Sequence, residues 1–378
     1  MKILIIGYSV RHIACSAARA GHDVIAADLF CDLDLERCAS RCIKIDQPEN
    51  QAEAGELVGS LIKRYPADCV VLGPGMEEVS VAGARLLNNP REKAAQVSDK
   101  LWLSGWLESR GFPSIPTLPL SEVSTLRCSK ACPLVVKPRK GAGGVGIELL
   151  ESLAGTDAFD KSGDDLIVQR WMRGLPASVS VISDGKESVA ISVNEQLIGE
   201  AFAGARGFRY CGNITPLMPD VSGLSSIAEE IVSELGLVGS NGVDLLLTGE
   251  GPVVVEVNPR FQGSLDAVEL STGLNVFSAH LSSFQGYLPE RPLAKIAAGR
   301  AVIFAEKEIT VQNLLKEPWI TDIPRPGSVI KKDDPVASIL VRGLCRDAVM
   351  DSLAGKAGEL REKVGLKIRS LDHQERTL

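Results

Sequence analysis

The chain lacks most features that mark membrane, secreted or nucleic-acid-binding proteins. It has 378 residues, a formal net charge of -7, and no block rich in Lys and Arg. A phosphate backbone would be repelled by this charge, so we expect no nucleic acid partner. The apolar run at residues 3–6 is too short for a signal peptide, and no later run approaches the roughly 18 residues of a membrane span. We therefore expect a cytoplasmic protein with no membrane association.

Cysteine and histidine also lack the spacings of disulfide frameworks and zinc sites. Nine cysteines are scattered along the chain without a C-x-x-C pair. We expect reduced, mostly structural thiols, because free cysteine behaves as a small core residue. The four histidines, His12, His22, His280 and His373, are too far apart for metal-ligand spacing. A zinc site is not expected.

The composition is that of a globular protein, with 45% hydrophobic and 24% charged residues. At roughly 150 residues per domain, the length predicts two to three domains, and we expect three. The predicted boundaries are 1–90, 91–290 and 291–378, with a lid subdomain at about 115–175 in the second. The predicted fold class is α/β for the first part, followed by α+β.

Strands and helices alternate in the first ninety residues. An apolar run at 3–6, a helical stretch at 14–20 and a second strand at 23–27 predict a parallel, Rossmann-like sheet. The turn after the first strand has one glycine, Gly7, where a dinucleotide site needs three. NAD binding is therefore excluded at this turn.

A glycine-rich loop stands between two predicted strands. Its four glycines are Gly141, Gly143, Gly144 and Gly146. Glycine is costly in entropy but lets backbone N–H groups approach a phosphate. Because residues 147–150 read as a strand, the helix of a dinucleotide fingerprint is missing, and no Lys-Ser or Lys-Thr makes a Walker A loop. A β-hairpin that covers a triphosphate remains, and the alternative is a mobile surface hairpin.

Two lysines flank this loop in the sequence. Lys137 lies on the strand that leads into it, and we predict a phosphate contact for its ammonium group. Lys100 follows Asp99 at the start of a predicted helix and is a candidate for a second phosphate contact. For Lys100 the alternative is a solvated side chain beside a helix-capping Asp.

A second hairpin carries acidic residues. Alternation along its second strand places Glu256, Asn258 and Arg260 on one face. If the loop is odd and centred on Glu250, Asp244 lies opposite Glu256, whereas an even loop would send the two carboxylates to opposite faces. Two facing carboxylates are unfavourable unless a proton or a cation lies between them.

Magnesium would resolve that conflict. Oxygen atoms of Asp, Glu and Asn suit Mg²⁺, which takes its remaining ligands from water and substrate phosphates. We therefore predict a metal site made of Asp244, Glu256 and Asn258. The alternative is a structural Glu256 paired with Arg260.

Taken in order and spacing, these residues resemble the ATP-grasp superfamily over roughly residues 1–290. The resemblance rests on Lys100, Lys137 with its glycine loop, the strand around 167–174, Asp244 and the run 256–260. The last run is similar to the biotin carboxylase and carbamoyl-phosphate synthetase branch, and the whole chain resembles predicted ATP-dependent carboligases. This implies an ATP-grasp fold with an N-terminal Rossmann-like pre-ATP-grasp domain and a C-terminal β-rich extension that completes the module.

The resemblance also implies a role for each residue. ATP and magnesium are the implied cofactors, with two metal ions and with manganese as a substitute. Backbone groups near Gln169 and Trp171 would receive adenine, and the two lysines would hold phosphates. Arg260 would contact the reacting phosphate or acid, which makes Arg260 and Lys137 the expected catalytic residues. Arg170 and Ser178 stand where many relatives have a glutamate, so the ribose contact stays open.

The activity implied is that of an ADP-forming ligase. A small acid would be phosphorylated to an acyl phosphate and then attacked by an amine or another nucleophile. Two alternatives stay open: a carboxylase that uses bicarbonate, and a nucleotide-binding protein without turnover. No biotin-attachment Met-Lys motif is present. A homodimer is also left open.

We expect the acid near residues 8–11 and 73–77, because ligands collect at the carboxyl ends of parallel strands. The candidate anchors for its carboxylate are Arg11, Arg206, Arg209 and Arg260. For Arg206 and Arg209 the alternative is an exposed, solvated loop.

Overall fold

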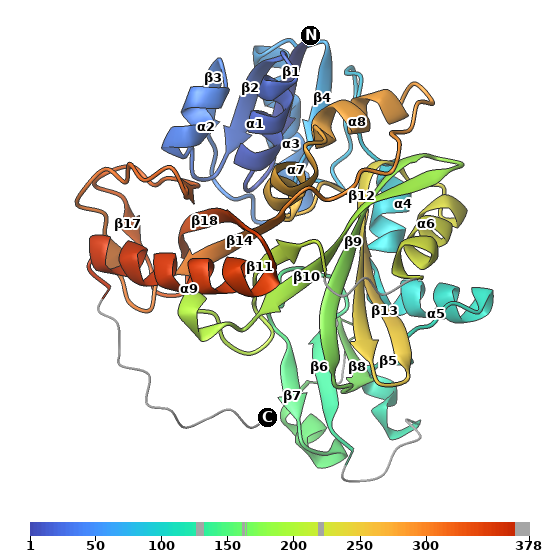
Figure 1. Ribbon diagram of the computed structural model, residues 1–378. Coiled ribbons are helices and arrows are strands. Elements are labelled where there is room, and N and C mark those ends of the chain that lie inside the picture. Colours follow the sequence, from blue (N-terminus) through green and yellow to red (C-terminus); the bar gives the residue numbers. More distant parts are fainter. Residues whose placement is uncertain (126–131, 161–162, 164, 218–222, 367–378) are drawn as a thin grey trace.

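The protein is represented by a computed structural model that describes residues 1–125, 132–160, 163, 165–217 and 223–366. The described strands form a parallel sheet, a long antiparallel sheet, a small antiparallel sheet and a two-stranded ribbon (Figure 1). The ribbon joins β15 (Ile309–Thr310) to β17 (Val329–Ile330). The expected mixture of an α/β part with an α+β part is confirmed.

The parallel sheet is N-terminal and has the order β3-β2-β1-β4. Its strands are β1 (Lys2–Ile6), β2 (Asp23–Asp28), β3 (Arg41–Lys44) and β4 (Cys69–Leu72). Alternate residues of β1 enter different cores: Ile3 and Ile5 pack with Phe277, while Leu4 packs with Val58. Because both faces are covered, the strand is apolar from Ile3 to Ile6.

Helices cover both faces of this sheet, and two of them come from far along the chain (Figure 1). They are α1 (Arg11–Arg19), α3 (Gln51–Arg64), α7 (Leu265–Thr272) and α8 (Val276–Ser283). The short α2 (Leu33–Cys38) packs beside α1. This contact joins Cys15 to Cys38 in a disulfide, with Cα atoms 5.1 Å apart. The prediction of reduced thiols is therefore wrong for this pair, because helix packing brings together two residues 23 positions apart.

The antiparallel sheet runs in the order β13-β12-β9-β10-β11-β14-β18-β16. Its strands are β9 (Gly174–Asp184), β10 (Ser188–Ile198), β11 (Tyr210–Thr215), β12 (Val238–Thr248), β13 (Gly251–Asn258), β14 (Ala297–Phe304), β16 (Ile320–Thr321) and β18 (Pro335–Gly343). The C-terminal strands continue this sheet through the β11–β14 pairing. The predicted domain boundaries stay predictions.

Four helices pack against this sheet: α4 (Arg91–Val97), α5 (Lys100–Arg110), α6 (Leu224–Glu234) and α9 (Arg346–Lys363). The first three join an apolar core with β9, β12 and β13, whereas α9 packs on β14 and β18. Short 3-10 helices lie at Leu120–Thr125, Leu153–Ala158 and Ala201–Ala203. None of the helices described is long and apolar enough to cross a bilayer.

The small sheet has the order β5-β8-β6-β7 and its own apolar core. Its strands are β5 (Thr117–Pro119), β6 (Leu134–Pro138), β7 (Glu148–Leu150) and β8 (Leu166–Arg170). The β6–β7 pairing confirms the predicted glycine-loop hairpin, with Lys137 on the strand that enters it. In Figure 1 this sheet lies at the end of the molecule opposite the parallel sheet.

Candidate active site

A cavity of about 820 Å³ lies where the three sheets meet. It is lined by the β6–β7 loop, the end of β8, β9 to β13, and the turns after β1 and β4. Ligand pockets in proteins measure roughly 300–1,000 Å³, so this cavity has room for a nucleotide-sized molecule.

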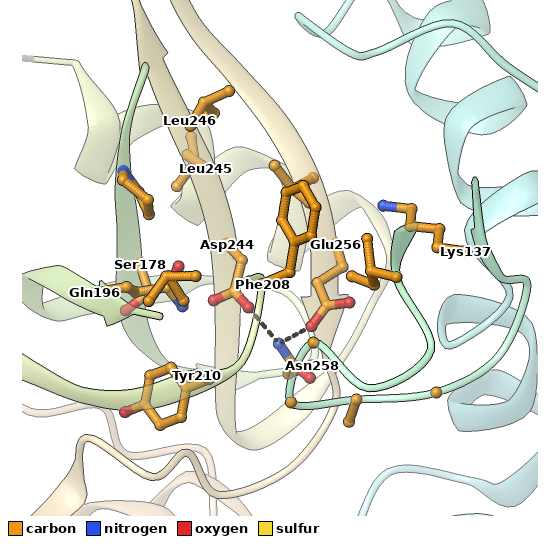
Figure 2. A pocket seen from close by; sticks show the side chains of 18 of the residues that line it. Lys137, Ser178, Gln196, Phe208, Tyr210, Asp244, Leu245, Leu246, Glu256 and Asn258 are labelled. Carbon is orange, nitrogen blue, oxygen red and sulfur yellow. Dashed lines mark hydrogen bonds between the residues drawn. The ribbon is translucent and has the colours of Figure 1, made fainter. Parts of the chain in front are cut away.

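One wall of the cavity carries the acidic residues of the β12–β13 hairpin. Asp244 and Glu256 are directly paired across the two strands. The Asn258 amide nitrogen donates to Asp244 Oδ2 at 3.1 Å and to Glu256 Oε1 at 3.3 Å. Figure 2 shows both carboxylates turned toward this amide group. The predicted shared face is therefore confirmed, while metal binding by these residues stays a prediction.

The pairing was predicted from an odd loop centred on Glu250, and that loop is wrong. At the end of the hairpin Thr248 pairs with Gly251, which leaves a two-residue loop rather than an odd loop centred on Glu250. A register shift between Asp244 and Leu245 inserts Val255 as an extra residue on β13. A β-bulge of this kind places two residues opposite one, which reverses the effect of the even loop on the carboxylates.

The two carboxylates differ in their electrostatic surroundings. Burial and the neighbouring Glu256 raise the pKa of Asp244 well above its usual range. Burial also acts to raise the pKa of Glu256, but Lys100, Lys137 and Arg260 together lower it below the usual value. Nearby positive charge thus compensates the carboxylate of Glu256, whereas the carboxylate of Asp244 has too little positive charge around it.

The donor set fits a hard divalent cation bound together with a phosphate ligand. In the described part of the chain, no group of three His, Cys, Asp or Glu side chains is placed to hold a metal. Two carboxylates and one amide carbonyl are therefore what the protein offers here, and they are oxygen donors of the kind Mg²⁺ accepts. The Asn258 amide would have to rotate to turn its oxygen toward the ion.

The two predicted lysines lie across from this pair. Lys100 Nζ donates to the Gly141 carbonyl at 2.7 Å and lies 3.4 Å from Glu256 Oε2. It is buried, so the solvated alternative is excluded, while Asp99 caps the helix as expected. Lys137 is only 4% exposed, and burial lowers its pKa to about 8 despite the nearby Glu256.

The glycine loop is closed over the cavity. The Tyr210 N–H donates to the Gly143 carbonyl at 3.1 Å. Gly144 has a positive φ of 76°, and a Cβ added there would lie 1.8 Å from the Phe208 carbonyl oxygen. Gly141, Gly143 and Gly144 line the cavity, whereas Gly146 packs against Pro138 at the base of the hairpin. Glycine is therefore required at the tip, where two backbones touch.

The wall beneath the loop is apolar and contains the residues predicted for adenine. Val135, Leu246 and Val255 line this part of the cavity. The Gln169 amide donates to the Thr117 hydroxyl at 2.7 Å, and the Trp171 N–H donates to the Pro133 carbonyl at 2.9 Å. The backbone N–H of Trp171 is thus already hydrogen-bonded, which leaves its backbone carbonyl and its indole ring for a ligand.

The predicted arginine anchors separate into two groups. Arg260 lines the cavity, with its Nε 2.8 Å from Glu77 Oε1. Arg206 is exposed, and Arg209 stacks over the Phe304 ring at 3.9 Å, and neither lines the cavity. The solvated alternative fits Arg206, and anchoring by either residue is not supported.

Arg11 is also wrong as an anchor. Its guanidinium is held by Asp266, with nitrogen–oxygen distances of 3.0 and 2.6 Å, and by Asp322 at 2.8 Å. It is 3% exposed and does not line the cavity. Its position in the turn after β1 suggested a substrate contact, but its partners come from segments more than 250 residues away.

Sequence reasoning missed several polar residues of the cavity wall, namely His12, Gln196, Tyr210 and Arg300. Gln196 and Tyr210 lie near Asp244 in Figure 2. His12 directly follows the turn that was predicted to hold the acid, so extending that prediction by one residue would have included it. Arg300 lies on β14, where no sequence pattern indicates a site.

Comparison with known proteins agrees with this geometry. An ATP-grasp domain model matches residues 97–264. The uncharacterized protein MJ0776 of Methanocaldococcus jannaschii is 23% identical, with 90% of this chain and 88% of the relative covered. A probable alpha-L-glutamate ligase 1 of a Shewanella species is 23% identical, with 78% and 96% covered.

A solved structure shows the same fold. Biotin carboxylase from Campylobacter jejuni, determined as a complex with beta-gamma-ATP, has a TM-score of 0.73 at 16% identity. The match covers 93% of this chain and 89% of that protein. The expected resemblance to ATP-grasp proteins is confirmed, and the fold is shared with the biotin carboxylase branch.

Proposed function

This chain carries an ATP-grasp domain, and from that premise we propose that it is an ADP-forming ligase. It phosphorylates a carboxylate of a small acid and couples the resulting acyl phosphate to an amine or another nucleophile. The probable alpha-L-glutamate ligase similar to this chain supports carboxylate activation of this kind. The bicarbonate-using alternative is less well supported.

The observation that carries the proposal is the pairing of Asp244 with Glu256 opposite two buried lysines. A cavity wall that holds two carboxylates next to Lys100 and Lys137 suits a ligand that carries both a positively charged metal ion and negatively charged groups. MgATP is such a ligand, since its metal would lie against the carboxylates and its phosphates against the lysines. A nucleotide sensor without turnover would use the same charges to bind MgATP, so a turnover assay is what separates the two.

The residues of the chain have distinct parts in the reaction. Lys100 and Lys137 bind phosphate oxygens, and the loop closed by the Gly143–Tyr210 contact excludes water from the cavity. Arg260 lies between the acidic pair and the turns after β1 and β4, where it can orient the acid against the transferring phosphoryl group. When bound, magnesium supplies positive charge to that group.

Asp244, Glu256 and Asn258 are proposed to hold this magnesium. We expect two ions, with manganese able to replace magnesium, because each carboxylate can contribute to more than one ion. Location in the cytoplasm and the absence of nucleic acid partners are parts of the same proposal. A homodimer stays open.

The test is a turnover assay with a panel of small acids and amines. Wild-type protein with MgATP should release ADP and phosphate only when a suitable acid is present, and hydroxylamine should trap the acyl phosphate as a hydroxamate. Release of AMP would contradict an acyl phosphate route. Turnover that needs bicarbonate and no other acid would favour the carboxylase alternative.

A further inference from the structure

The cavity continues beyond Arg260 into a deep end at the parallel sheet. There it is lined by Ser9, His12 and Pro74, which follow β1 and β4, and by Arg300 from β14. Carboxyl ends of parallel strands are frequent ligand sites. The hairpin residues and lysines described above belong to the other two sheets and to α5 and are assigned to MgATP, so we take the deep end as the place for the acid.

His12 is the most informative side chain in this region. It is 5% exposed, and its Nε2 has no hydrogen-bond partner among the described residues. Burial lowers its pKa to about 4; the neighbouring Arg11 and Arg300 also lower it, whereas Asp266 and Asp322 raise it. The ring is therefore neutral at pH 7. An unpaired buried nitrogen is costly, and with the ring proton on Nε2 it would donate to an acceptor atom of a ligand, such as an oxygen of an anion.

Helix α1 begins at the same place. Its N-cap, Val10, has no side-chain cap hydrogen bond, and its first turn holds no acidic residue. A helix N-terminus has unpaired N–H groups and a positive partial charge, both of which favour an anion. Asp28 lies nearby, but its carboxylate accepts from the N–H groups of Val10, Phe30 and Cys31 and does not line the cavity.

The charges along the cavity point to the same ligand class. Among its described lining residues, Asp244 and Glu256 are the only carboxylates, and both belong to the proposed metal site. The deep end adds Arg300, whose Nη2 binds Asp322 and Ser338 and whose Nε lies 3.7 Å from Asp266 Oδ2 but has no hydrogen-bond partner in the described structure. No lining carboxylate remains there to neutralise a substrate ammonium group.

We propose that the acid substrate carries a second anionic group, a carboxylate or a phosphate, which the deep end binds through the start of α1, His12 and Arg300. A zwitterionic α-amino acid is thereby disfavoured as the acid that is phosphorylated. This inference rests on the proposed function, because it takes one carboxylate of the same molecule to lie near Arg260. It goes further by stating that the far end of that molecule carries an anionic group.

The test compares four acids of similar length in calorimetric titrations of the MgADP-bound protein. Succinate and 3-phosphonopropionate carry a second anion, succinamate a neutral amide, and β-alanine an ammonium group. We expect each dianion to bind at least about tenfold more tightly than succinamate, as for one hydrogen bond to a charged group, and β-alanine to bind weakest. The stronger of the two dianions identifies the group as carboxylate or phosphate.

Two variants assign the preference to the deep end. His12→Ala should remove most of the preference for dianions while leaving MgADP affinity unchanged. His22→Ala is the matched control, since His22 lies just after the other end of α1, packs against the edge of Phe277 and does not line the cavity. This variant should bind all four acids as the wild type does.

The outcomes separate this inference from the proposed function. If MgADP binds but the four acids bind equally, or none binds at millimolar concentration, the inference is overturned and the ligase proposal stands. Tighter binding of β-alanine, or an unchanged preference in His12→Ala, also overturns it. Failure of MgADP itself to bind would instead contradict the proposed function.

Discussion

Two groups of charged side chains, one half-buried and one largely buried, lie in this molecule, and they differ in how well their charges are balanced. In the first, Asp244 and Glu256 face each other with only an amide group between them. In the second, Arg11 binds Asp266 and Asp322, and Arg300 Nη2 lies 2.7 Å from Asp322 Oδ2. We call these the acidic pair and the arginine cluster.

The arginine cluster joins α1, α7, β14 and the segment after β16, so it connects the helices on the parallel sheet to the antiparallel sheet. Arg11 and Arg300 are each paired with buried or half-buried carboxylates, although Arg300 Nε keeps no hydrogen bond in the described structure, and burial therefore costs less than it would for single charges. In the acidic pair, nearby cations compensate Glu256 but leave the pKa of Asp244 raised. The comparison teaches that a buried charge becomes a candidate for function when its partners are missing, and a candidate for structure when they are present.

The largest effect is expected on the functional side of this comparison. Lys137→Ala should abolish turnover and weaken MgADP binding, because it removes a buried cation beside Glu256. The fold should remain intact. Lys140→Ala on the same hairpin is the control, since Lys140 is exposed and pairs with Glu78 at 2.9 Å. Calorimetric titration with MgADP is the measurement, and equal affinity in the wild type and Lys137→Ala would remove Lys137 from the site.

The arginine cluster should respond through stability instead. Asp266→Asn leaves Arg11 without its bidentate partner and should cost about 3–5 kcal/mol of unfolding free energy, as for other broken buried ion pairs. Glu36→Gln breaks an exposed pair with Arg325 and should cost less than about 1 kcal/mol. Urea unfolding measures both. Similar losses of unfolding free energy in the two variants would show that the arginine cluster stabilises the fold no more than an exposed ion pair does.

Closure of the glycine loop can be changed without touching either charge group. Gly144→Ala should lower turnover about tenfold or more, because its Cβ would meet the Phe208 carbonyl and prevent the loop from reaching its position. Gly143→Ala is matched to it, with a similar positive φ but open space around the added Cβ. Hydrogen exchange of residues 141–146 with MgADP reports closure. Equal turnover in the two variants would argue against the contact.

A smaller effect is expected at Asp32, which lies beside the arginine cluster and whose pKa Arg11 lowers less than its other surroundings raise it. Burial, followed by Asp322, Asp28 and Asp34, raises its pKa to about 9. Because the folded pKa exceeds the unfolded one, this group supports the fold below about pH 4 and opposes it progressively as the pH rises toward 9.

The unfolding free energy of Asp32→Asn should therefore exceed that of the wild type by at least about 1 kcal/mol at pH 8 and should equal it at pH 4. Thermal unfolding at both pH values is the measurement. A gain that is the same at the two pH values would mean that the charge of Asp32 is not its cause. The result sharpens the comparison, since an unbalanced carboxylate outside the cavity should affect stability alone.

The sequence was sufficient where local patterns decide the structure. The apolar run of β1, the glycine-loop hairpin and the cap at Asp99 all follow from short segments, and the structure has them where the patterns predicted. The pairing of Asp244 with Glu256 was also predicted, but through an odd loop. The hairpin instead has an even loop and a bulge at Val255, and no residue type in the hairpin predicts such a bulge.

Long-range contacts explain the other differences. Arg11 was assigned to the substrate because its partners, Asp266 and Asp322, could not be identified from a single sequence. The disulfide between Cys15 and Cys38 likewise depends on how two helices pack. The exposed state of Arg206 reflects the path of a loop. In each case the missing information was the set of neighbours, which determines whether a charge or a thiol is free.

The same substitution at one residue of each charge group tests the central claim most directly. Asp244→Asn removes the carboxylate whose pKa is raised, and it keeps the shape of the side chain. Its unfolding free energy should equal or exceed that of the wild type, while magnesium-dependent turnover should fall by roughly a hundredfold or more. Asp266→Asn should show the opposite pattern, with a large loss of stability. Near-normal magnesium-dependent turnover in Asp244→Asn would contradict the account.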